Sequence, residues 1–193
     1  MTLAQIVNRV VSETHGEHLK PQIVQRVLDT VRAVHSGSNF DRDTQVFDFE
    51  VDIEPGSMCL GALHDTVDLS EIPSRRKVVN VICIESSGAV HPCAEASNYQ
   101  DFHKDSAYTY FQMGDRLYVK GLRAFQFISV QVLVNPELTE THADSWVMDI
   151  YPTYVIKAVL AETMKIIGDD AWQLEYREAK ELLADIKRME RRV

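Results

Sequence analysis

The period of the apolar residues changes twice along this 193-residue chain. Residues 1–40 carry two stretches with apolar side chains at helical spacing, and the same spacing returns after Pro152. Between them, residues 47–53 alternate apolar and acidic side chains without interruption, which is the pattern of a strand with one buried face. Neither helical pair can bury its apolar stripe alone, so the two pairs are expected to pack together. The sequence therefore predicts an α+β fold: a four-helix bundle formed by the N- and C-terminal helix pairs, with an inserted antiparallel β domain.

The domain boundaries follow from the same changes of period. We expect residues 1–40 and 144–193 to form the helical body and residues 41–143 to form the inserted antiparallel β domain. Residues 187–193 are expected to form an extended C-terminal tail. Because no helical segment links the expected strands, their sheet should be mostly antiparallel.

Local signals mark several element ends. Thr2 is expected to cap the first helix, Pro21 to lie in the first turn of the second, and Gly168 to end the third. Further strands are expected at residues 78–84, 107–111, 117–120 and 127–134. Residues 65–77 and 85–106 are expected to be long loops.

Composition and charge exclude several classes of function. The chain has 29 acidic residues against 20 Lys and Arg, and the net charge of -9 argues against binding of its bulk surface to nucleic acid or to an anionic membrane. No apolar run approaches the roughly 20 residues that span a bilayer. The N-terminal residues lack the basic start and apolar core of a signal peptide, so a cytosol-like compartment is expected. In such a compartment the three cysteines are not expected to form structural disulfides.

The negative charge is concentrated in one region. Residues 41–71 contain nine acids and a single basic residue, Arg42. Three of these acids, Asp48, Glu50 and Asp52, alternate along the expected strand and so share one face. They lack the central glycine of a calcium-binding loop, and a solvated strand face is the favoured interpretation.

The C-terminus has the opposite sign. The apolar stripe of the last helix ends at Ile186, and a basic cluster follows it. The cluster consists of Lys187, Arg188, Arg191 and Arg192, opposed by Glu190 alone. Two interpretations remain open: basic residues matched to the helix dipole, or a tail that docks into a partner.

No pattern of residues indicates catalysis or metal binding. His15 and His18 flank Gly16 at an expected helix end, where a polar loop between helices is the better interpretation. The remaining soft ligands have irregular spacing: Cys59, His64, Cys83, His91, Cys93 and His103. We therefore predict no catalytic site, no cofactor and no metal. Two alternatives stay open, namely a small cytosolic cysteine-dependent hydrolase using Cys59 or Cys93, and a ligand-binding module.

The second half of the chain resembles a known family. A strand ends in Asn135-Pro136, an acidic stretch with Trp146 leads to Tyr151-Pro152 and a helix, and Gly168-Asp169-Asp170 precedes a final helix with a basic end. This order is similar to that of tailed-phage head-to-tail adaptors, also called head-completion or tail tubular proteins. The opening 2–10 and the passage 67–79 also resemble this family, whereas residues 85–104 match nothing in it.

The resemblance implies a structural virion protein, assembled in the host cytoplasm. Such an adaptor is a ring, by family a dodecamer, that connects the portal protein of the capsid to a downstream tail or nozzle protein and continues the DNA channel. DNA passes through it without specific binding, and no membrane is involved. By the same resemblance the tail inserts between portal subunits, with Lys187, Arg188, Arg191, Arg192 and Val193 as its residues. Part of the acidic face of Asp48, Glu50 and Asp52 is then expected to line the channel.

Aromatic residues at the ends of the last two helices are expected to be structural. They are Trp146, Tyr151, Trp172 and Tyr176, together with the helix-starting Pro152. Aromatic and apolar residues beyond the needs of one small core would supply the contacts that close a ring. For Trp172 and Tyr176 we expect burial in the core.

Overall fold

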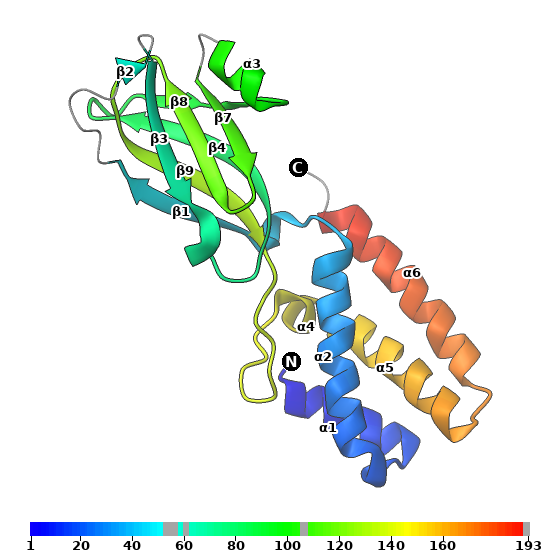
Figure 1. The fold of residues 1–193 in the computed structure, drawn as a ribbon. Coiled ribbons are helices and arrows are strands. Elements are labelled where there is room, and N and C mark those ends of the chain that lie inside the picture. Colours follow the sequence, from blue (N-terminus) through cyan, green and yellow to red (C-terminus); the bar gives the residue numbers. More distant parts are fainter. Residues whose placement is uncertain (52–57, 60–61, 105–107, 191–193) are drawn as a thin grey trace. The chain divides into compact units, whose positions relative to one another are not determined.

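The computed structural model describes residues 1–51, 58–59, 62–104 and 108–190. It confirms the α+β class and divides the chain into two compact units (Figure 1). The helical unit comprises Met1–Asp43 and Asn135–Val193, and the β unit comprises Thr44–Val134.

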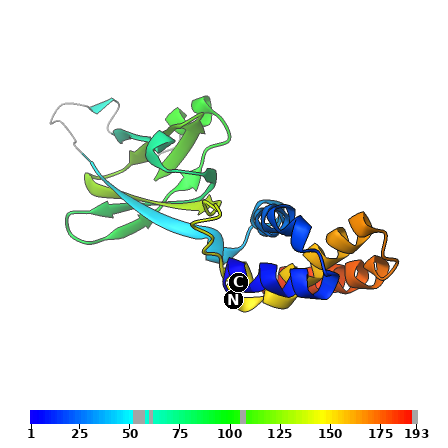
Figure 2. The ribbon, with the colours of Figure 1, turned by 90° about the horizontal axis from the view of Figure 1, so that it is seen from below.

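The helical unit is built around helix α5. Its α-helices are α1 (Leu3–Thr14), α2 (Lys20–Gly37), α4 (Trp146–Ile150), α5 (Pro152–Ile167) and α6 (Trp172–Glu190), and its 3₁₀ turns are η1 (Glu17–Leu19) and η2 (Asp41–Asp43). Helix α5 contacts α1, α2 and α6, and α1 also packs on α2. Figures 1 and 2 show α5 and α6 running side by side, in orange and red, from the turn at Gly168. Lys157 of α5 reinforces this pair, because its Nζ lies 2.8 Å from Glu175 and 2.9 Å from Glu178 of α6.

The helix ends follow the local signals in the sequence. Thr2 caps α1 in a capping box with Gln5, in which each side chain bonds to the other residue's backbone N–H. Pro21 lies in the first turn of α2. Gly168 ends α5 with φ +76°, a left-handed conformation that glycine adopts without steric cost.

The helical core takes side chains from both ends of the chain. Ile6, Val10, Ile23, Val155 and Val159 are fully buried in one cluster. Burial of a side chain of this size contributes about 1.5–3 kcal/mol, so this cluster explains why segments more than a hundred residues apart fold as one unit.

Residues 135–143 also lie in the helical unit, although we expected them in the β domain. Leu138 is buried in the helical core, and its carbonyl accepts a hydrogen bond from Arg32 of α2. The unit likewise extends to Asp43 rather than to residue 40. Long-range contacts decide these boundaries, and a change of period does not show them.

The β unit contains two sheets. The strands are β1 (Thr44–Glu50), β2 (Met58–Cys59), β3 (Ala62–Asp68), β4 (Arg75–Glu85), β5 (Val90–Pro92), β6 (Ala94–Glu95), β7 (Thr109–Met113), β8 (Arg116–Gly121) and β9 (Phe125–Val134). One sheet has the order β1-β9-β4-β5 and the other the order β2-β3-β8-β7-β6. The unit also carries α3 (Tyr99–Lys104) and the 3₁₀ turn η3 (Leu69–Glu71). One hydrophobic cluster takes Val81 and Ile128 from the first sheet and Leu117 and Val119 from the second, so the two sheets pack face to face.

Pairing within the β unit is mostly antiparallel, as predicted, but two segments that we expected to be loops hold regular elements. Strands β6 and β7 pair in parallel, whereas the other paired strands of the described residues are antiparallel. Strand β3, which pairs with β8, begins before residue 65 and occupies the start of a segment that we expected to be a loop. The segment 85–106 likewise holds β5, β6 and α3. These elements are short, and their pairing partners rather than an internal pattern define them.

Candidate functional site

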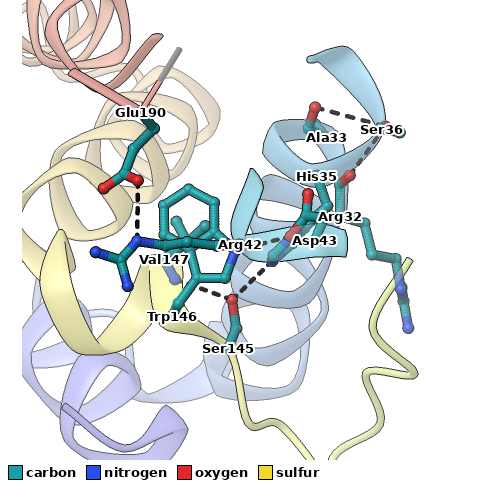
Figure 3. A network of polar contacts seen from close by, with 10 residues as sticks. All are labelled: Arg32, Ala33, His35, Ser36, Arg42, Asp43, Ser145, Trp146, Val147 and Glu190. Atoms are coloured by element: carbon teal, nitrogen blue, oxygen red, sulfur yellow. Dashed lines mark hydrogen bonds and ion pairs between the residues drawn. The ribbon is translucent and has the colours of Figure 1, made fainter. Parts of the chain in front are cut away.

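A buried polar network lies within the helical unit, between α2, η2 and the start of α4. Nδ1 of His35, near the end of α2, lies 2.7 Å from Oδ1 of Asp43, and Nε2 of His35 lies 2.8 Å from Oγ of Ser145 (Figure 3). The same Asp43 oxygen accepts a hydrogen bond of 2.8 Å from Nε1 of Trp146. His35 is 1% exposed, Asp43 5% and Ser145 7%. The network therefore ties α2, η2 and the start of α4 together out of contact with water.

A hydrogen-bonded chain of serine, histidine and aspartate is also the catalytic arrangement of many hydrolases. In this protein, Ser145 has another role. Its Oγ accepts a hydrogen bond of 3.2 Å from the backbone N–H of Val147 and so caps α4. With the proton on Nδ1, His35 donates to Asp43 and accepts from the Ser145 hydroxyl, which satisfies both ring nitrogens. Both contacts engage the Ser145 hydroxyl, so it links the His35 ring to the start of α4. The geometry therefore favours a structural role, in which the network holds α2, η2 and α4 together, over a catalytic triad.

The C-terminal end of α6 is held in place. Tyr151 donates a hydrogen bond of 2.8 Å from its hydroxyl to Oε1 of Glu190, and Nε of Arg42 lies 2.9 Å from Oε2 of the same carboxylate. Burial and the Glu190 carboxylate raise the pKa of Tyr151 above its usual value. Helix α6 therefore runs to Glu190, and Lys187 and Arg188 lie in this helix rather than in an extended tail.

The basic cluster is thus divided. Arg188 is exposed on α6 and forms an ion pair of 3.0 Å with Asp185. Arg191, Arg192 and Val193 lie outside the described residues.

The acidic residues of β1 lie on its exposed face. Asp48 and Glu50 are exposed, whereas Phe47 and Phe49 are half-buried and pack against the core of the β unit. Asp52, the third member of the expected face, lies outside the described residues.

The aromatic residues fall into two groups. Trp146 lies edge-on to His35, Phe40 and Tyr151, so it belongs to the buried network, and Pro152 begins α5. Trp172 is half-buried under Lys165, whose Nζ lies 5.1 Å from the ring centroid. Tyr176, which we expected in the core, is 56% exposed. Its position on the apolar stripe of α6 is as predicted, but it lines an open groove between α2, α5 and α6 instead of the core.

Large apolar side chains gather around the turn that joins α5 and α6. Ile166 and Ile167 at the end of α5 and Leu174 and Tyr176 at the start of α6 are all between 43% and 56% exposed. We call these four residues the apolar tip. A groove of about 360 Å³ continues from Tyr176 between α2, α5 and α6, with Tyr154, Ala158 and Leu183 among its lining residues. Exposed large apolar side chains that lie close together in the chain are candidates for a site of association.

The histidines and cysteines of the sequence are distributed over both units. His15 ends α1 in a left-handed conformation with φ +51°. Among the described residues no group of three or more His, Cys, Asp or Glu is placed to hold a metal ion. Cys83 and Cys93 belong to no recognised sequence motif. They nevertheless lie close together in the β unit, with their sulfur atoms 3.3 Å apart.

Sequence reasoning missed both the buried network and this cysteine pair. His35 and Ser145 are 110 residues apart, and nothing in the sequence relates them. One local signal was present, since a serine before the apolar stretch 146–148 is a typical helix cap.

Comparison with known proteins adds no family. No protein-family model matches the chain, and a search of curated proteins found no matching relative. In the part of the chain that the structure describes, no helix has the length and apolar character needed to cross a membrane. The surfaces and contacts described above therefore carry the functional argument.

Proposed function

We propose that this chain is a ring-forming head-to-tail adaptor of a tailed-phage virion. The observation that carries the proposal is the apolar tip, where four large apolar side chains lie exposed on both sides of one turn and could be buried by a partner. In this proposal the partner is the next copy of the same chain. In such a heterologous interface, two different surfaces of neighbouring copies meet. Repeating the contact closes a ring when the rotation between neighbouring copies divides a full turn.

The architecture supports the same proposal. Elements from both ends of the chain form the helical unit, and the β unit is inserted between them, which is the order expected from the resemblance. As a finer part of the proposal, α1, α2, α5 and α6 act as one four-helix body that carries the ring contacts. The proposed ring is a dodecamer that lies between the portal protein and a downstream tail or nozzle protein.

Charged substitutions in the apolar tip are expected to weaken ring assembly. In the double variant Leu174→Glu/Tyr176→Glu, each subunit would bring two carboxylates into the apolar contact, and burying an unpaired charge is costly. We expect association to weaken at least tenfold, which corresponds to about 1.4 kcal/mol. Light scattering and native mass spectrometry over a range of concentrations, with and without the portal ring of the same virus, measure this effect.

The matched control is Gln173→Glu, which adds a carboxylate at an exposed polar position of the same helix turn. It should assemble like the original chain. A chain that stays monomeric at all concentrations and on the portal would contradict the proposed function. Equal assembly of the double variant and the control would remove the apolar tip from the interface.

The portal contact is proposed for the basic end of α6. Arginine pairs with carboxylates through a planar fork, and each exposed pair contributes only about 0–1 kcal/mol, but a ring repeats the contact in every subunit. A chain ending at Glu190 lacks Arg191, Arg192 and Val193 but keeps the bonds of Glu190 to Tyr151 and Arg42. We expect it to fold normally and to bind the portal at least tenfold more weakly in a sedimentation or surface-binding assay.

Removal of residues 187–193 is a less specific test. It also deletes Glu190 and exposes the hydroxyl of Tyr151, so reduced portal binding would be mixed with reduced stability. Unchanged portal binding of the chain ending at Glu190, at physiological salt, would leave the dipole-matched helix end as the interpretation of the basic cluster.

The acidic face of β1 is proposed to contribute to a non-adhesive channel wall. DNA must slide through a head-to-tail ring, and carboxylates such as Asp48 and Glu50 repel phosphate and release no counterions on contact. This role, which extends to Asp52, depends on the assembled ring.

A further inference from the structure

Cys83 and Cys93 form a buried thiol pair in the first sheet of the β unit. Cys83 lies on β4, and Cys93 lies between β5 and β6. Their sulfur atoms are 3.3 Å apart. The backbone N–H of Cys93 donates a hydrogen bond of 2.8 Å to the carbonyl of Val81, so the chain on both sides of the pair is fixed by sheet pairing.

The two thiols differ in accessibility and acidity. Cys83 is fully buried, whereas Cys93 is 8% exposed. A hydrogen bond from Cys83 lowers the pKa of the Cys93 thiol, and the same contact with burial raises the pKa of Cys83. Cys93 is therefore the better nucleophile, because the thiolate is the reactive form of cysteine.

Polar groups surround one side of the pair. The carboxylate of Glu85 accepts hydrogen bonds from Nε2 of His91 at 2.9 Å and from the hydroxyl of Tyr108 at 3.0 Å, and the rings of His91 and Tyr108 are stacked 4.3 Å apart. His91 pairs directly with Cys83 across β4 and β5. Residues at these positions share a sheet face with the thiols, so the pair lies beside a hydrogen-bonded polar cluster at the rim of the core.

We propose that Cys83 and Cys93 are a redox-active dithiol that forms a reversible intramolecular disulfide. The oxidant is a low-molecular-weight disulfide such as glutathione disulfide. The Cys93 thiolate attacks one sulfur of the oxidant, forms a mixed disulfide and releases one glutathione. Cys83 then loses its proton and attacks the sulfur of Cys93, which breaks the mixed disulfide and releases the second glutathione. The protein loses two electrons and two protons, and the oxidant takes them up as two thiols.

The two sulfur atoms already lie close together in the reduced protein. A disulfide has a sulfur–sulfur distance of about 2.05 Å, so the two sulfur atoms, which lie 3.3 Å apart, must move closer to each other to form it. The bond would link β4 to the segment that carries β5 and β6, which are short strands at the edges of their sheets. Oxidation would therefore stiffen this edge of the β unit without changing the fold. This inference is independent of the proposed virion role.

The test uses the full chain in glutathione buffers of graded oxidation, with acid quenching, alkylation and intact mass measurement. The chain contains three cysteines, of which the third is Cys59. We expect the oxidised chain to weigh two hydrogen atoms less and to take up one alkyl group instead of three, and peptide mapping should join Cys83 to Cys93. Cys59→Ser is the matched control and should oxidise in the same way.

The single variants test the order of the two steps. Cys83→Ser should stop at a mixed disulfide of Cys93 with glutathione, whereas Cys93→Ser should react far more slowly. The measurement on the unsubstituted chain stands even if a variant fails to fold. Full alkylation of the folded chain after treatment with excess glutathione disulfide, a disulfide that involves Cys59, or a link that forms only in denaturant would each overturn the proposal.

Discussion

Replacing Asp43 with alanine is expected to lower the free energy of unfolding of the helical unit by about 3–5 kcal/mol. Oδ1 of Asp43 accepts from the His35 ring at 2.7 Å and from the Trp146 indole at 2.8 Å. Alanine removes this shared acceptor and leaves two buried N–H groups without it. Each unsatisfied buried group costs about 1–3 kcal/mol, and the vacated space adds to this.

Two variants separate this effect from general damage. Asp43→Asn keeps an oxygen at the position of Oδ1 and places an amide at Oδ2, which has no hydrogen-bond partner among the described residues. We expect it to cost only about 1 kcal/mol. Asp41→Ala removes an exposed carboxylate from the same 3₁₀ turn and should lie within about 0.5 kcal/mol of the original chain.

Urea unfolding followed by tryptophan fluorescence measures these differences, since Trp146 belongs to the network itself. If Asp43→Ala and Asp41→Ala had equal stability, the buried network would contribute nothing beyond an exposed side chain. If Asp43→Asn were as damaging as Asp43→Ala, the charge rather than the hydrogen-bond acceptor would be the stabilising element.

The second large effect is expected at Lys120 in the β unit. Lys120 is 2% exposed on β8, and its Nζ donates hydrogen bonds of 2.7 Å to the carbonyl of Phe102 and 3.5 Å to that of His103. These carbonyls belong to the last turn of α3, where the helix itself leaves carbonyl groups unpaired. The ammonium group also lies 5.6 Å from the centroid of the Phe102 ring. One buried cation therefore attaches a six-residue helix to the sheet.

Lys120→Ala is expected to lower the stability of the β unit by about 3 kcal/mol, because it removes the hydrogen bonds from Nζ to α3 and opens a cavity. Hydrogen exchange should show faster exchange of the amides of α3, as a local loss of protection. Lys120→Met retains much of the packing volume and should recover part of the loss. Lys77→Ala, at an exposed position of β4, should leave both measurements unchanged. Normal protection of α3 in Lys120→Ala would contradict this role.

The sequence by itself determined the local elements and the fold class. Thr2, Pro21 and Gly168 have backbone requirements that hold in any tertiary context, so their positions at helix ends could be predicted. The alternation through Phe47 and Phe49 likewise predicted strand β1 and its exposed acids, because side chains of a strand alternate between its faces.

Periodicity identifies an apolar face but not what covers it. Tyr176 lies on the predicted stripe of α6, yet it is exposed, because the packing of neighbouring elements decides which part of a stripe is buried. The length of α6 also depends on contacts with distant parts of the chain. Its last turn is held by Tyr151 and Arg42, which are 39 and 148 residues from Glu190.

Only the tertiary structure decided which polar and thiol groups meet. His35 and Asp43 are eight residues apart, Ser145 lies 110 residues from His35, and Cys83 and Cys93 meet through the pairing of β4 and β5. The unit boundary at residues 134–135 belongs to the same class, because the burial of Leu138 assigns its segment to the helices. Local sequence restricts the backbone through steric and hydrogen-bonding preferences within a few residues. Contacts between distant residues depend on the free energy of burying them together, which exists only once the chain has folded.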